Sequence, residues 1–182
     1  MEKDLFYLLD SYLKLSDKLR PGYTDTLVKK DKVSIQLPTS LKKVYSKISG
    51  TYYEIEDQKM MDFIPGYLLI RDTEYESFKK LLDKIVMDKN DNFYPFLVNY
   101  SSDFYAIKVK DNHELGVYTI DHDMPDVIKI HNSIEDFFKT IISCYEENVY
   151  FLDEDGYLDM DFDKEQIIGQ KFNPDIDYWF EE

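Results

Sequence analysis

Four segments of the chain carry apolar side chains at three- and four-residue spacing, a pattern that is typical of amphipathic helices. Pro21-Gly22 ends the first of them, because proline followed by glycine cannot continue a helix. The pattern predicts helices over residues 2–20, 38–50, 73–86 and 134–145.

Capping residues mark the ends of two of these helices. Thr39 or Ser40 can cap the second helix at its start, and Gly50 stands where a left-handed residue commonly ends a helix. Ser133 is followed three residues later by Asp136, which resembles a capping box with Asp in place of the usual Glu. The fourth helix should therefore begin directly after Ser133.

Short β-rich segments separated by turn signals fill the middle of the chain. They predict strands at residues 52–55, 67–70, 96–100, 104–109, 116–120 and 127–130, with a further short strand or extended lead-in at 33–37. The last four follow one another so closely that they indicate an antiparallel meander.

The fold class that follows is α+β, with a single, mainly antiparallel β-sheet of about six strands covered by helices. We expect one domain over residues 1–182, with a core at about 33–146, an N-terminal helix at 2–20 and an acidic C-terminal segment at 147–182. The helix stripes and the strands predict a set of buried residues: Leu41, Val44, Tyr45, Leu69, Phe78, Leu82, Val117, Phe137 and Ile141.

Charge narrows the classes of partner. The chain of 182 residues has a formal net charge of -15, which disfavours binding to nucleic acid and to anionic membranes. Residues 146–182 carry 13 acidic and 2 basic side chains, so most of the excess lies there. There is no stretch of about 18 apolar residues, and no signal peptide is evident. With the single thiol Cys144, this favours a cytoplasmic protein.

Candidate chemistry is sparse. The acidic run around Gly156 fails as an EF-hand loop, because alignment on that glycine puts Phe151 and Phe162 at the two essential ligand positions. His113, His122 and His131 are far apart in sequence and are expected on the surface, and Cys144 is expected to be a semi-buried structural thiol. The sequence therefore predicts no catalytic residue, metal or cofactor, although an enzyme with a carboxylate cleft stays an alternative.

The order of motifs resembles the SUKH superfamily, which includes the yeast cell-wall synthesis regulator and many bacterial toxin-immunity proteins. The resemblance covers about residues 33–146 and rests on four groups of residues, Leu37-Pro38-x-x-Leu41, Ile64-Pro65-Gly66-Tyr67-Leu68, the meander motifs after Phe93, and Ser133-Ile134-Glu135-Asp136-Phe137-Phe138. It implies an α+β fold and a non-enzymatic, protein-binding role. The first helix and the acidic C-terminal segment lie outside it.

The function expected from this resemblance is that of a bacterial immunity protein that binds and neutralises a cognate polymorphic toxin. A regulatory or scaffold role on the same fold is the alternative, and the oligomeric state stays open. An acidic surface favours a basic toxin domain as the partner, because complementary charge accelerates association. Tyr150 and Phe162 flank the expected binding residues, which are Asp153, Glu154, Asp155, Tyr157, Asp159, Asp161 and Asp163.

A solvated edge whose acids confer only solubility is an equally good interpretation of that segment. If the segment is not the binding surface, the loops at residues 54–62 and 122–126 are the next candidates.

Overall fold

The computed structural model describes residues 4–27, 36–86, 92–123 and 126–180. It confirms the α+β class. Five antiparallel strands form one sheet in the order β1-β2-β3-β4-β5, and two more form a separate hairpin. The strands are β1 (Tyr67–Leu69), β2 (Asn92–Asn99), β3 (Phe104–Lys110), β4 (His113–Ile120), β5 (Val127–His131), β6 (Tyr150–Leu152) and β7 (Leu158–Met160).

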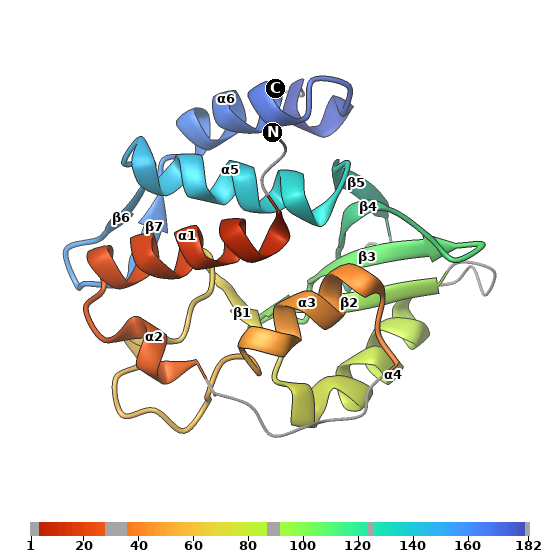
Figure 1. Ribbon diagram of the computed structural model, residues 1–182, viewed down its shortest axis with the longest axis horizontal. Coiled ribbons are helices and arrows are strands. Elements are labelled where there is room, and N and C mark those ends of the chain that lie inside the picture. Colours follow the sequence, from red (N-terminus) through yellow and green to blue (C-terminus); the bar gives the residue numbers. More distant parts are fainter. Residues whose placement is uncertain (1–3, 28–35, 87–91, 124–125, 181–182) are drawn as a thin grey trace.

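Helices cover the sheet. In Figure 1, α1 and α5 lie side by side and α6 lies along the outer side of α5, while α4 packs on β2. The α-helices are α1 (Leu5–Leu19), α2 (Tyr23–Thr26), α3 (Thr39–Lys47), α4 (Tyr75–Ile85), α5 (Ile134–Glu146) and α6 (Phe162–Phe172). Three short 3-10 helices join them: η1 (Gln58–Met60), η2 (Asp72–Glu74) and η3 (Asp177–Phe180).

The predicted core is correct except at one position. Eight of the nine residues are buried, with exposed fractions between 0% and 8%. Phe78 is the exception: it is only half-buried, and its ring meets the edge of the Phe104 ring at 6.2 Å. It lies on the side of α4 that borders solvent, so it packs against the core without being enclosed by it.

The structure confirms the predicted start of the fourth helix and corrects both ends of the second. The Ser133 hydroxyl accepts the Asp136 N–H at 3.0 Å, so the expected cap of α5 is confirmed. At α3, however, the N-cap position is Pro38, and neither Thr39 nor Ser40 caps the helix. This helix ends at Lys47, before Gly50, whose φ of +111° instead allows the chain to pass close to the backbone of Ile70 and Arg71.

Two segments differ in secondary structure from the prediction. No strand forms at 52–55; only Thr51 pairs, donating its N–H to the Leu69 carbonyl at 2.9 Å. The β-rich side chains of Tyr53 and Ile55 pack on the core instead, and packing of this kind is what β-propensity mostly measures. The short helix α2 forms just after Pro21-Gly22, outside the four predicted helices. The lead-in at 33–37 lies largely outside the described residues.

The acidic C-terminal segment is folded. It contains the β6–β7 hairpin, α6 and η3, none of which was predicted. Trp179 fixes its end to the sheet, because the indole Nε1 donates to the Ile130 carbonyl at 2.6 Å. Asn132 Nδ2 donates to Asp175 at 2.7 Å, and the Asn173 amide contacts Thr140 in α5. The described part of the segment therefore packs on α5 and β5.

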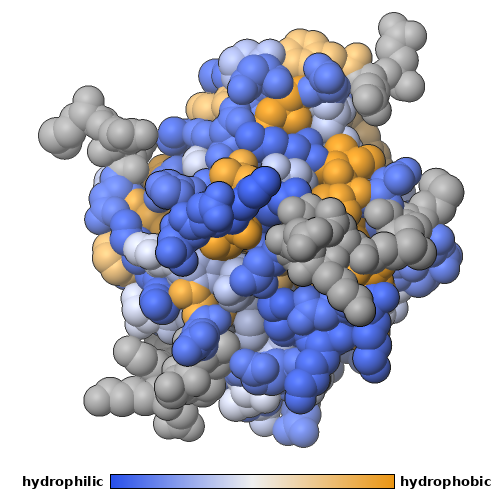
Figure 2. All heavy atoms as spheres, turned by 90° about the vertical axis from the view of Figure 1, so that its right-hand side faces the viewer, coloured by the Kyte–Doolittle hydropathy of each residue, from blue (hydrophilic) through white to orange (hydrophobic). Residues whose placement is uncertain are grey.

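Figure 2 shows one face of the molecule as mainly hydrophilic, with apolar atoms in separate small patches. No continuous apolar area dominates the part of this face that the described residues form.

Candidate functional site

The β6–β7 hairpin, which we call the acidic hairpin (residues 150–160), presents most of the residues that sequence analysis singled out. Its turn has Gly156 at φ +87°, a conformation that favours glycine. Asp153 Oδ1 accepts the N–H groups of Asp155 and Tyr157 at 2.9 and 2.8 Å. Asp153 is therefore half-buried and holds the turn, whereas Glu154, Asp155, Tyr157 and Asp159 are exposed.

The two remaining candidates lie at the start of α6. Asp161 caps this helix, accepting the Lys164 N–H at 3.2 Å and pairing with the Lys164 ammonium at 2.6 Å. These bonds lower the pKa of Asp161 below its usual range. Asp163 is exposed in the first turn. The seven candidates therefore lie along the acidic hairpin and the first turn of α6. Asp153 and Asp161 also accept hydrogen bonds from the backbone.

Exposed apolar side chains gather in the same segment. Phe162 is 70% exposed, and Ile167, one and a half turns further along α6, is 64% exposed. Phe162 was expected to flank the binding residues, but the exposure of Ile167 in α6 and of Phe180 in η3 was not predicted, because neither helix was. The large exposed apolar residues of the segment are Phe151, Leu152, Tyr157, Phe162, Ile167 and Phe180.

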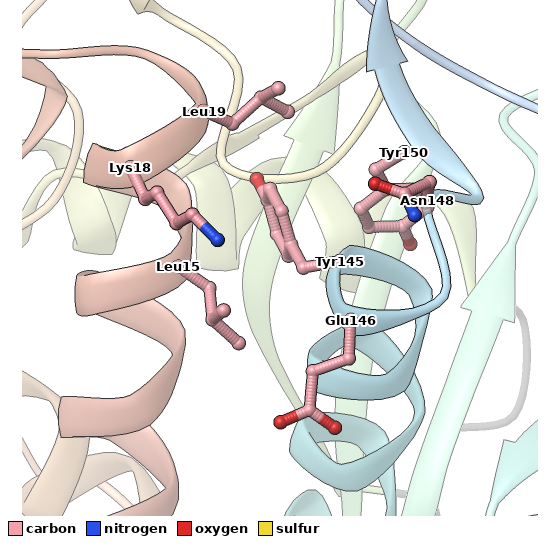
Figure 3. Close-up of a pocket in the computed structure, with 7 residues that line it drawn as sticks. All are labelled: Leu15, Lys18, Leu19, Tyr145, Glu146, Asn148 and Tyr150. Atoms are coloured by element: carbon pink, nitrogen blue, oxygen red, sulfur yellow. The ribbon is translucent and has the colours of Figure 1, made fainter.

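A pocket lies elsewhere, between the ends of α1 and α5, with a volume of about 380 Å³. Figure 3 shows Leu15, Lys18 and Leu19 of α1 facing Tyr145 and Glu146 at the end of α5. Asn148 and Tyr150 complete the lining. The described lining residues include one cation and one carboxylate but no histidine, serine or cysteine.

A buried cation lies behind this pocket. The Arg20 side chain is 2% exposed, and its guanidinium lies 3.9 Å from the centre of the Tyr23 ring. It donates to the Tyr145 hydroxyl at 3.4 Å and to the Lys59 carbonyl at 3.5 Å. None of the described carboxylates lies within 4 Å of it, so Tyr23 and Tyr145 are its main partners. Arg20 therefore links the end of α1 to α2, α5 and η1.

The described histidines behave differently from one another. His113 and His122 are exposed, but His131 is 2% exposed, so its expected surface position is wrong. Its ring packs against Phe137 and Trp179, and burial lowers the pKa of His131 to about 3. It lies on the inward face at the end of β5, where the C-terminal segment covers it. His131 is therefore a neutral core residue.

Cys144 is completely buried, where a semi-buried position was expected. Burial raises the pKa of its thiol, which keeps the sulfur protonated and unreactive.

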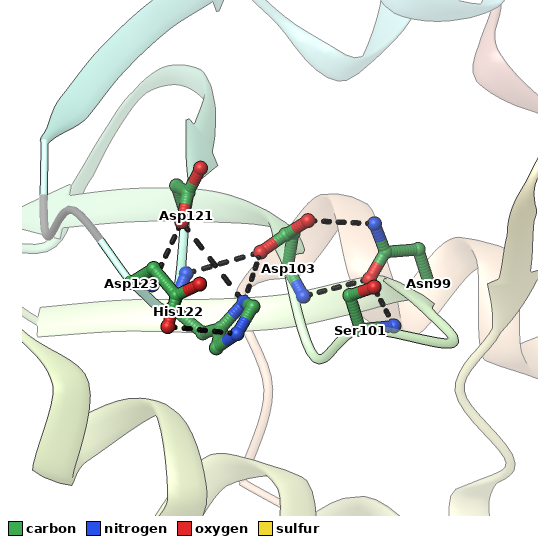
Figure 4. Close-up of polar contacts among 6 residues, drawn as sticks. All are labelled: Asn99, Ser101, Asp103, Asp121, His122 and Asp123. Carbon is green, nitrogen blue, oxygen red and sulfur yellow. Dashed lines mark hydrogen bonds and ion pairs between the residues drawn. The ribbon is translucent and has the colours of Figure 1, made fainter.

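His122 belongs to a group of acids at one end of the sheet (Figure 4). Its Nδ1 lies 2.7 Å from Asp103 Oδ1 and 4.0 Å from Asp121 Oδ1, and its Nε2 lies 3.1 Å from Asp123 Oδ1. The hydrogen bond to Asp103 raises the pKa of His122 above its usual value. The group joins the turn between β2 and β3 to the loop after β4.

The same group has ligand atoms suited to a divalent cation. One atom each from Asp103, Asp121 and His122 lie within 4.8 Å of one another. All of these side chains are exposed or half-exposed, and the carboxylates pair with His122 when its imidazole is protonated. A carboxylate–histidine cluster in a deep pocket would have supported an enzyme. The residues of this cluster line neither the pocket between α1 and α5 nor a second pocket between α6 and η3.

None of the described helices is both long enough and apolar enough to cross a membrane. This agrees with the sequence, which has no apolar run of the required length.

Comparison with known proteins agrees with the observed fold. The model of the SMI1 / KNR4 family (SUKH-1) matches residues 27–140, which is more than half of the chain. A search of curated proteins finds no significant match. The matched region contains the five-stranded sheet with α3 and α4 and about half of α5, and it leaves out α1, the acidic hairpin and α6. The chain therefore belongs to the SMI1 / KNR4 family (SUKH-1), a family of generally non-enzymatic immunity and regulatory proteins that typically bind protein partners.

Proposed function

We propose that this chain is a cytoplasmic bacterial immunity protein that binds and neutralises a toxin domain with a basic surface. The family includes toxin-immunity proteins, which supports this class of function. The observation that carries the proposal is the concentration of exposed aromatic and acidic side chains in one folded segment, residues 147–182, outside the matched family region.

The two kinds of side chain act at different stages of binding. Exposed acids such as Glu154, Asp155 and Asp159 attract a basic partner during diffusion and accelerate association. Phe162 and Tyr157, 70% and 43% exposed, offer apolar surface that a partner can desolvate, and such aromatic anchors contribute most of the affinity in protein interfaces.

The rigid attachment of the segment favours binding. Trp179 and Asn173 bind it to β5 and α5, so little conformational entropy is lost when a partner docks on it. A segment that served only solubility would need neither this attachment nor the exposed aromatic residues.

The experiment is co-expression with the product of the adjacent gene. We expect the two proteins to co-purify as a stable complex, and the toxicity of that product to be suppressed when this chain is present. Co-purification without any toxicity of the partner would instead support a regulatory or scaffold role. A chain that neither binds nor protects against the adjacent gene product would contradict the immunity proposal.

A further inference from the structure

A second pocket lies within the C-terminal segment, between the first turns of α6 and the 3-10 helix η3. Its volume is about 310 Å³. We call it the α6 pocket; its lining residues are Phe162, Asp163, Glu165, Gln166, Tyr178 and Trp179.

The aromatic wall of this pocket is held in place. Trp179 donates its indole N–H to Ile130 at 2.6 Å, and its backbone carbonyl accepts from Gln170 Nε2 at 2.7 Å. Tyr178 meets the indole edge-to-face at 5.0 Å. Phe162 stands at the rim, 70% exposed. The faces of aromatic rings attract cations.

Two carboxylates supply negative charge to the same space. Asp163 is exposed, and no described lysine or arginine pairs with it. Glu165 is half-buried and accepts the Tyr150 hydroxyl at 2.9 Å, which fixes its side chain. Burial raises the pKa of Glu165, so the pocket favours a group that compensates this carboxylate. A cation meets that requirement.

The pocket lies at the N-terminus of α6, a position that by itself disfavours a cation. The first turn of α6 contributes about half a positive charge, which repels a cation. Asp161 already accepts the Lys164 N–H there. Asp163 and Glu165 add two formal negative charges, so the carboxylates outweigh the helix dipole.

We propose that the α6 pocket binds an arginine side chain of the protein partner. A guanidinium is planar, so it can stack on an aromatic ring while donating hydrogen bonds to a carboxylate, which an ammonium group does less well. The inference rests on the proposed function only in taking a protein as the source of the arginine.

The test uses the fact that Trp179 is the only tryptophan of the chain, so its fluorescence reports on this pocket alone. The full chain is titrated with N-acetyl-arginine amide, and separately with the citrulline and lysine analogues. We expect a saturable change with arginine amide, a weaker one with lysine amide, and none with the neutral, nearly isosteric citrulline amide.

Two variants locate the site. Asp163→Asn should raise the dissociation constant for arginine amide about three- to five-fold, the equivalent of roughly 1 kcal/mol. Asp111→Asn removes the same charge from the exposed turn between β3 and β4, outside the pocket and the acidic hairpin, and should leave the constant unchanged. Far-UV circular dichroism confirms that both variants are folded.

Three results would overturn the proposal. The fluorescence response to arginine amide could equal the response to citrulline amide or to lysine amide, or the two variants could lose the same affinity for arginine amide. Such a result would not remove the proposed function, because binding of the toxin domain is measured separately. Conversely, a specific response to arginine amide stands even if the adjacent gene product does not bind.

Discussion

At the scale of single residues, the core depends on Phe137 in α5. Its ring centre lies 5.4 Å from that of Phe96 and 5.5 Å from that of His131, both in edge-to-face geometry. Aromatic pairs of this kind add about 0.5–1.5 kcal/mol to what burial alone contributes. Phe137 therefore joins the matched family core to the region that the C-terminal segment covers.

Replacing Phe137 by Ala should lower the free energy of unfolding by about 3–5 kcal/mol, because it removes apolar transfer energy and leaves a cavity. Urea unfolding followed by circular dichroism measures the loss. The matched control is Phe162→Ala, which removes the same side chain from a 70% exposed position and should change stability by less than about 0.5 kcal/mol. A loss below about 1 kcal/mol for Phe137→Ala would contradict its place in the core.

His122 gives the protein a pH-dependent contact. The hydrogen bond to Asp103 raises the pKa of His122, opposed by desolvation, and Asp123, Asp103 and Asp121 add to the rise. A raised pKa means that the folded state binds this proton more tightly than the unfolded state does. The stabilisation is therefore complete below about pH 6.5, the ordinary value for histidine, and is lost as pH rises through the folded pKa.

The partner carboxylate has the opposite dependence. Burial alone would raise the pKa of Asp103, but hydrogen bonds from His122 and Asn99 lower it overall. Its contribution is present above the ordinary aspartate value and is lost as pH falls through the lowered pKa. The contact between the two turns is strongest at pH values between the lowered pKa of Asp103 and the raised pKa of His122.

We expect His122→Asn to reduce stability at about pH 5.5 and to have a smaller effect at about pH 8.5, where the wild-type imidazole is neutral as well. Urea midpoints at the two pH values measure this. His113→Asn is the control, because the His113 ring is exposed and its Nδ1 lies 2.8 Å from the backbone carbonyl of Asp111 rather than beside a carboxylate. A His122→Asn effect that is equal at both pH values, or larger at the higher one, would contradict the account.

At the scale of secondary-structure elements, local sequence patterns were sufficient to predict the meander and the start of α5. Alternation and turn residues specify β2 to β5 within a short stretch of chain, and Ser133 caps its own helix. The strand predicted at 52–55 does not form, because pairing there depends on a partner strand that is not adjacent in the sequence. Only Thr51 finds one.

The C-terminal elements were missed because their acids were interpreted as a charged tract. One signal was present: Asp161 followed by Asp163 and Glu165 is a typical helix start, with acids near the positive end. The position of Trp179 over Gly169 could not be predicted, because it depends on how η3 folds back onto α6. The candidate residues of the acidic hairpin were thus named from the sequence, whereas the α6 pocket was not.

Gly169 decides how closely η3 approaches α6. A Cβ added at this position would overlap the indole ring of Trp179. Alanine normally stabilises a helix by about 1 kcal/mol relative to glycine. Here we expect Gly169→Ala to destabilise the protein by about 1–3 kcal/mol instead, because the indole must move out of its site.

The Trp179 emission maximum should shift to longer wavelength in this variant, and urea unfolding gives the energy. Ile167→Ala, at an exposed position of the same helix, is the control and should change neither measurement appreciably. A Gly169→Ala variant that is more stable than the parent, with unchanged emission, would refute the packing of η3 on α6.

At the scale of the whole molecule, charge and family membership divide the chain into two parts. The matched family region supplies the sheet, and the segment 147–182 contributes most of the net charge of -15. Because the segment is fixed to α5 and β5, its acids form a localised field rather than a diffuse tail. We propose that the chain is one domain in which the family core presents this segment to a partner.

The most direct test of this account is the association rate with the co-purified toxin domain, measured by stopped flow at low and high salt. In the triple variant Asp153→Asn, Asp155→Asn, Asp159→Asn we expect association at low salt to slow by about three- to ten-fold, with a weaker salt dependence and little change in dissociation. Asparagine at 153 keeps the oxygen that accepts the turn N–H groups.

The control carries the same change in net charge at exposed acids outside the segment, Asp25→Asn, Glu76→Gln and Asp111→Asn, and should associate at close to the parental rate. If the hairpin variant associates at the parental rate at low salt, or if the control slows equally, the acidic hairpin is not the surface that attracts the partner.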